Sequence, residues 1–118
     1  MVTMVEQKFD FSLDNEPELK RLVETASIYL ENETKETACP AVATWSLLST
    51  PGPDRISLHI DDPSLNVWAS RNFSTAELAD PDEIEKDIIR LWGTLLQRRS
   101  AVRIKKLTQA LAEEGAAK

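Results

Sequence analysis

Hydrophobic and polar residues follow a helical period in the first third of the chain. Apolar side chains recur every three or four residues, which is the spacing of one helix face; they are Leu19, Leu22, Val23, Ala26, Tyr29 and Leu30. Asn15, with Glu18 three residues later, resembles a capping box, and Pro17 suits a first helical turn. The pattern predicts an amphipathic helix that begins at Asn15 and ends near Glu31.

Polar and apolar residues alternate in the middle of the chain, as is typical of β-strands with one buried face. Segments rich in turn-forming residues lie at 50–54 and 61–64, and they separate three predicted strands at 42–49, 55–60 and 65–73. Both connections are too short for a parallel crossover. The three strands are therefore expected to form an antiparallel meander.

The last third of the chain predicts one long helix. Asp80 and Pro81 form its start, and an apolar stripe runs from Ile84 to Leu95. The stripe fails at Arg98 and Arg99, and a second apolar set then appears at a shifted angle, made of Val102, Ile104, Leu107 and Leu111. A helix over 81–114 would be about 51 Å long, whereas a compact domain of this size is only about 35 Å across.

The excess length leaves two alternatives for the long helix. It breaks near residues 97–101, or residues 101–118 protrude from the domain and pack against something else. No Gly, Pro or Asn marks a break, which favours the protruding helix. A second copy of the chain is the simplest cover for its apolar residues.

Together these elements predict a single α+β domain over residues 1–118. Its expected order is helix, three-stranded antiparallel meander and long C-terminal helix, with the helices packed on one face of the sheet. Alternation over residues 8–13 adds a short edge strand or an extended arm within residues 1–14. No run of 18 apolar residues is present, and residues 1–8 lack the apolar core of a signal peptide, so we expect a cytoplasmic protein without membrane contact.

Residue types that most catalytic and cofactor sites need are scarce. With three Gly, one His and one Cys, the chain has no glycine-rich phosphate loop, no intrachain disulfide and no His or Cys metal cage. Cys39 and His59 are its one thiol and one imidazole. Asp54, Asp61 and Asp62 offer oxygen ligands, but they also suit turns. We therefore expect no enzyme, no cofactor and no metal, and a metal-assisted enzyme at these carboxylates is the least favoured alternative.

Charge is unevenly distributed behind the net charge of −6. Residues 1–87 contain eighteen acids and seven bases, which leaves −11, whereas residues 88–112 contain six bases and no acid. On a helix, Arg99, Arg103 and Lys106 form one cationic stripe, and Arg98 lies beside it. This stripe would suit a nucleic acid, but the acidic body of the protein itself is a nearer anionic partner.

The order helix, three antiparallel strands, helix resembles two known families. One is the double-stranded-RNA-binding domain, which presents lysines at the start of its second helix; here that turn reads Asp82-Glu83-Ile84-Glu85 and would repel phosphates. The other is a small dimeric nucleoid-associated family, which agrees with this chain in element order, acidity and the dimerisation expected here, but shares no motif with it. Both resemblances imply an arrangement of elements and no activity.

The favoured hypothesis is a small non-catalytic protein-interaction module. It would form a homodimer, or bind another protein, through the C-terminal helix and through Trp68, which falls on the sheet face opposite Val67. The candidate partner-binding residues are Trp68, Arg98, Arg99, Val102, Arg103, Lys106 and Leu107. A nucleic-acid-associated protein that uses the basic stripe is the second hypothesis.

Overall fold

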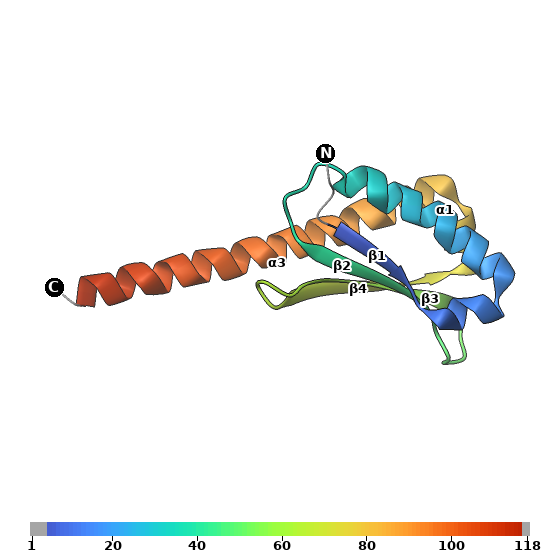
Figure 1. The fold of residues 1–118 in the computed structure, drawn as a ribbon, viewed down its shortest axis with the longest axis horizontal. Helices are drawn as coiled ribbons and strands as arrows, with labels where there is room; N and C mark the ends of the chain where they lie inside the picture. Colours follow the sequence, from blue (N-terminus) through green and yellow to red (C-terminus); the bar gives the residue numbers. More distant parts are fainter. Residues whose placement is uncertain (1–4, 117–118) are drawn as a thin grey trace.

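The computed structural model describes residues 5–116, in which helices cover one face of a four-stranded sheet (Figure 1). Residues 1–4 of the predicted N-terminal arm and residues 117–118 of the predicted protruding helix lie outside the described residues. The α+β class and the helix packing on one sheet face are confirmed.

The sheet has the order β1-β2-β3-β4. Strands β2 (Ala41–Leu47), β3 (Asp54–Asp62) and β4 (Val67–Ser74) form the predicted antiparallel meander. Strand β1 (Val5–Phe9) adds a fourth strand that runs parallel to β2, so the sheet is mixed. The parallel pairing is possible because a whole helix connects β1 to β2.

The bounds of every predicted strand shift by one or two residues in the structure. The edge strand expected from the alternation over residues 8–13 is β1, which ends at Phe9, and a 3₁₀ helix follows it from Phe11. Asp61 and Asp62 belong to β3 and not to the following turn, because both pair with β4. Leu65 precedes β4, and Asn66 adopts a left-handed conformation with φ of 54° that turns the chain between the two strands. The predicted alternation in β3 is confirmed, since Ile56, Leu58 and Ile60 are fully buried.

The first α-helix begins slightly later than predicted. Helix α1 (Pro17–Thr34) follows a short 3₁₀ helix, η1 (Phe11–Asn15), that contains Asn15. The predicted capping box at Asn15 is wrong, because Glu16 is the N-cap and makes no side-chain cap. Helix α2 (Thr75–Ala79) does begin with a capping box, in which Ser74 and Glu77 each accept the backbone N–H of the other.

Helix α3 (Pro81–Ala116) continues without a break for 36 residues, which is about 54 Å. Its last part leaves the body of the protein (Figure 1). The protein therefore measures 63 × 35 × 25 Å and has a radius of gyration of 17.1 Å, against about 13.5 Å for a compact chain of this length. Helix α3 has no break near residues 97–101, and within the described residues its part from 101 to 116 extends beyond the body. That this part packs against a partner stays a prediction.

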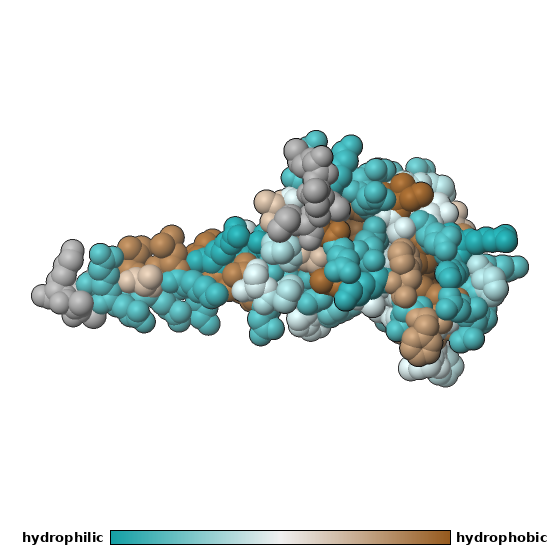
Figure 2. Space-filling model, in the orientation of Figure 1, coloured by the Kyte–Doolittle hydropathy of each residue, from teal (hydrophilic) through white to brown (hydrophobic). Residues whose placement is uncertain are grey.

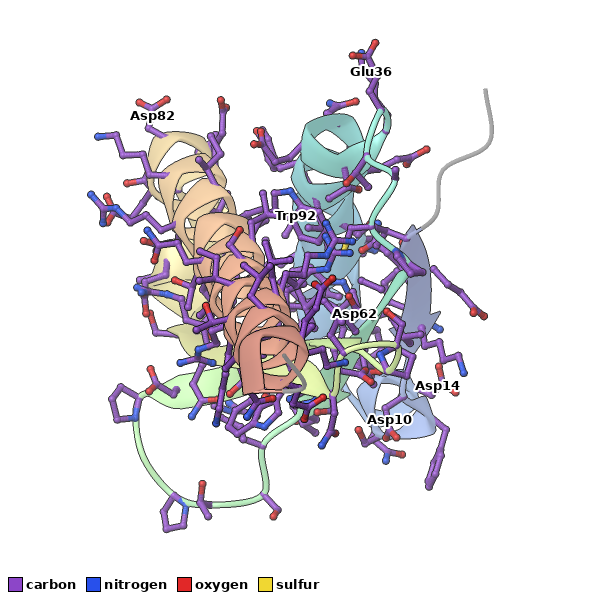
Figure 3. All side chains as sticks on the ribbon, turned by 90° about the vertical axis from the view of Figure 1, so that its left-hand side faces the viewer. Asp10, Asp14, Glu36, Asp62, Asp82 and Trp92 are labelled. Carbon is purple, nitrogen blue, oxygen red and sulfur yellow. The ribbon has the colours of Figure 1, made fainter. Side chains whose placement is uncertain are left out.

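The core lies between the sheet and the helices. Its largest fully buried side chains include Trp45 and Phe73 from the sheet and Leu30, Ile84, Ile88 and Leu95 from α1 and α3. Viewed from the end of α3, Trp92 lies between α3 and α1, and Asp62 lies on the side of α3 that faces the sheet (Figure 3). None of the helices within residues 5–116 combines the length and apolarity needed to cross a bilayer.

Candidate protein-interaction surface

An apolar stripe runs along the exposed side of α3, and we call it the outer stripe. It consists of Ile89, Gly93, Leu96, Ser100, Ile104, Leu107 and Leu111. Its three members on the protruding part, Ile104, Leu107 and Leu111, are 60–64% exposed, and Ile89 and Leu96 on the body are 43% and 36% exposed. Figure 2 shows hydrophobic residues, in brown, along one edge of the protruding helix. Large aliphatic side chains are seldom exposed in such a row unless a partner covers them.

The spacing of the outer stripe keeps it on one side of the helix. Successive members are three or four residues apart, and the pattern repeats after 11 residues, from Ile89 to Ser100 and again to Leu111. Eleven residues in three turns give 3.67 residues per turn, which nearly matches the α-helix. The stripe therefore extends straight along α3 for about 33 Å.

A buried ion pair holds α3 at the point where it leaves the body. Arg99 Nε lies 2.5 Å from Asp62 Oδ2, and the two side chains are 11% and 0% exposed. The other oxygen of Asp62 accepts hydrogen bonds from the backbone N–H and the hydroxyl of Ser64, at 2.9 and 2.5 Å. Arg99 thus joins α3 to the last residue of β3, and it lies inside the fold, away from the surface on which the basic stripe was predicted.

The surroundings of Asp62 favour its charged form. Burial alone would raise its pKa, but the hydrogen bonds from Ser64 and Arg99, with the positive charge of Arg99, outweigh burial and lower the pKa below its ordinary value. Cys39 lies in the same place, with Sγ 4.0 Å from Asp62 Oδ2. Burial raises the pKa of the Cys39 thiol in spite of the nearby Arg99 and Arg103, so this cysteine is a core residue rather than an activated nucleophile.

A shallow groove of about 390 Å³ opens between the start of β4 and α3, and we call it the Trp68 groove. Its walls are Asn66, Val67, Trp68, Arg98, Ala101 and Val102. The Trp68 side chain is 53% exposed. Its ring lies 5.4 Å from the ring of His59 and 5.7 Å from the Arg98 guanidinium, measured between centres. Arg98 also donates a hydrogen bond to the backbone carbonyl of Trp68.

The predicted partner-binding residues therefore divide between two sides of α3. Trp68, Arg98 and Val102 line the Trp68 groove, whereas Leu107 belongs to the outer stripe. Val102 and Ile104 were predicted to form one apolar set, but residues two positions apart point to different sides of a helix. Arg103 and Lys106 are exposed on the protruding part.

The candidate catalytic groups are not brought together. Cys39 contacts Asp62 on the covered face of the sheet, whereas His59 stacks on Trp68 on the open face. Asp54 and Asp62 lie at opposite ends of β3, about 26 Å apart along an extended strand. Asp61 and Asp62, being consecutive in a strand, point to opposite faces. Within residues 5–116, no group of three acidic, His or Cys side chains is placed to hold a metal ion.

A second buried carboxylate escaped the sequence analysis. Asp87 is 1% exposed and pairs with Arg71 of β4 at 3.1 Å and with Arg90 at 3.8 Å. Arg71 also reaches Glu77 of α2 at 3.2 Å. The cluster fastens α3 to β4 and α2. Its one signal in the sequence is the position of Asp87 beside Ile88 on the apolar side of the helix.

Comparison of the chain with known protein families, with curated proteins and with solved structures gives no match.

Proposed function

We propose that the protein is a non-catalytic interaction module that forms a homodimer through α3. The observation that carries this proposal is the exposure of the outer stripe, above all of Ile104, Leu107 and Leu111 on the part of α3 that leaves the body. Three exposed aliphatic side chains contribute nothing to the stability of a helix end in water, whereas burying the exposed part of each would contribute about 1–2 kcal/mol. A cytoplasmic location belongs to the same proposal and stays a prediction.

A second copy is favoured as partner because the surface is a single straight helix face. Most soluble oligomers are homo-oligomers, and a two-fold dimer uses the same patch on both subunits. The buried Asp62–Arg99 pair supports the proposal, because it fixes the direction in which α3 leaves the body. Preorganisation of this kind lowers the entropic cost of association.

The Trp68 groove is the second part of the proposed contact surface. Trp68 is partly exposed, and the Arg98 guanidinium lies over its ring and donates a hydrogen bond to its backbone carbonyl. Tryptophan and arginine are frequent anchors of protein interfaces. A nucleic-acid contact has less support, because Arg98 and Arg99 both have partners inside the chain. The other bases of residues 98–106 are Arg103, Lys105 and Lys106, and all three are exposed.

Two variants with the same charge change test the proposal. Leu107→Glu places a carboxylate on the outer stripe, and Gln109→Glu places one on another side of the same exposed turn. Light scattering coupled to gel filtration should give a dimer for the unmodified protein and for Gln109→Glu, and a monomer for Leu107→Glu. A monomer in all three, or equal dimers in all three, would show that α3 does not form the contact in this way.

A further inference from the structure

We infer that the two copies pair through antiparallel α3 helices, crossing at Ser100 of each copy. This inference rests on the proposed function, since it names the partner surface and the register of the same contact. It follows from the residue types along the outer stripe, from two opposite charges at its ends and from a cavity beside it.

Ser100 is the centre of the outer stripe. Leu96 and Ile104 lie four residues from it on either side, Gly93 and Leu107 lie seven residues away, and Ile89 and Leu111 lie eleven residues away. In an antiparallel pair centred on Ser100, residues equally distant from it face each other. Each large aliphatic residue then meets another aliphatic residue or the glycine, and no member of the stripe is left uncovered.

The two small residues of the outer stripe, Gly93 and Ser100, lie where the antiparallel pair requires close approach of the helices. Ser100 would face its own copy at the crossing point, where a small side chain permits close approach of two helices. A Cβ placed on Gly93 would meet no atom within 4 Å, so the space above it is open. Leu107 of the other copy would lie over this glycine, as a side chain packs into a hole between residues of a facing helix.

Two charged residues just beyond the ends of the outer stripe agree with the same register. Lys86 and Glu114 both lie fourteen residues from Ser100, and both are exposed. Antiparallel pairing places each lysine opposite a glutamate, and the symmetry of the dimer forms this pair twice. Parallel pairing would place lysine opposite lysine and glutamate opposite glutamate, which is unfavourable.

A cavity on the body lies where the end of the partner helix would pack. A hollow of about 200 Å³ lies between α1 and α3, and its walls include Tyr29 and Ile89. In the antiparallel register, Leu111 of the second copy faces Ile89. The partly exposed ring of Tyr29 would then cover the side of that leucine, so the protruding part of each α3 is seated on the body of the other copy.

Cysteine cross-linking distinguishes the register from the dimer itself. Ser100→Cys should form an interchain disulfide under mild oxidation, whereas Leu111→Cys should not, because the two 111 positions would be about 33 Å apart along the helices. A chain that carries both Ile89→Cys and Leu111→Cys should cross-link. The unmodified protein is the control for Cys39, which is buried.

Charge reversal supplies an independent test in solution. Lys86→Glu should raise the dimer dissociation constant about tenfold. Losing one exposed Lys86–Glu114 pair changes this constant only a few-fold, but the dimer contains the pair twice. Lys86→Glu combined with Glu114→Lys should restore the original value. Failure of the restoration contradicts the register.

The outcomes separate the two claims. A dimer in which Leu111→Cys cross-links with itself overturns the antiparallel register and leaves the homodimer intact, and so does a dimer in which Ser100→Cys stays reduced. A protein that remains monomeric by light scattering overturns the proposed function and this inference together.

Discussion

Replacing Arg99 by methionine tests the ion pair that joins α3 to the end of β3. Methionine keeps most of the apolar stem of the arginine and removes the guanidinium. Asp62, which is fully buried, would then keep its hydrogen bonds from Ser64 but lose its charged partner. Leaving one member of a buried ion pair uncompensated costs about 3–5 kcal/mol.

This cost is large relative to the stability of an ordinary domain, which is about 5–15 kcal/mol. Unfolding entropies of about 2.1 cal/mol/K per residue convert it to a fall of about 12–20 °C in Tm for a chain of this size. Urea unfolding followed by circular dichroism, at one fixed protein concentration, measures the free energy of unfolding directly.

Arg103→Met is the matched control, because Arg103 lies one turn further along α3 and is exposed. It should change the free energy of unfolding by no more than about 0.5 kcal/mol. The double variant Asp62→Asn, Arg99→Met should recover most of the loss, since no charge is then left buried. A loss below about 1 kcal/mol in Arg99→Met would refute the reasoning, because that is the effect of an exposed ion pair.

Three further predictions concern groups whose environment the structure defines. Because the folded state lowers the pKa of Asp62, this carboxylate stabilises the fold fully above its unfolded pKa of about 3.9 and loses that contribution as pH falls through its folded pKa. Below about pH 4, the free energy of unfolding should therefore fall less steeply with pH in Asp62→Asn than in the unmodified protein. Equal pH slopes in the two proteins would contradict this. Ser74→Ala removes the N-cap of α2 and should cost about 1 kcal/mol, whereas Ser70→Ala on the open sheet face should cost almost nothing; similar losses in the two would count against the cap. Cys39 is 2% exposed with a raised pKa, so Ellman's reagent should modify it slowly in the native protein and rapidly in urea, and rapid native modification would disprove its burial.

The sequence predicted those helices and strands that are recognisable from the residue pattern within the segment itself. The alternation in β3 is visible because strand side chains point alternately to two faces. The continuity of α3 through residues 97–101 follows from the absence of Gly, Pro and Asn there. The parallel pairing of β1 with β2 joins segments separated by α1, and no local pattern records which distant strand a segment pairs with. The correct start of α1 was missed because Asn15 caps nothing and ends η1 instead.

The candidate surface was predicted only in part. Leu107 and its neighbours were identified as needing cover, but Ile89 and Leu96 were not linked to them, because the adjacent α1 decides which side of α3 stays open on the body. Arg99 was assigned to a surface stripe on the basis of its charge. Its position four residues after the buried Leu95 was the available signal that it points inward.

Sedimentation equilibrium of the unmodified full chain tests the central claim most directly. The account predicts a molar mass twice that of the 13.3 kDa chain at tens of micromolar, with dissociation on dilution. The mass of a single chain at every concentration would contradict it.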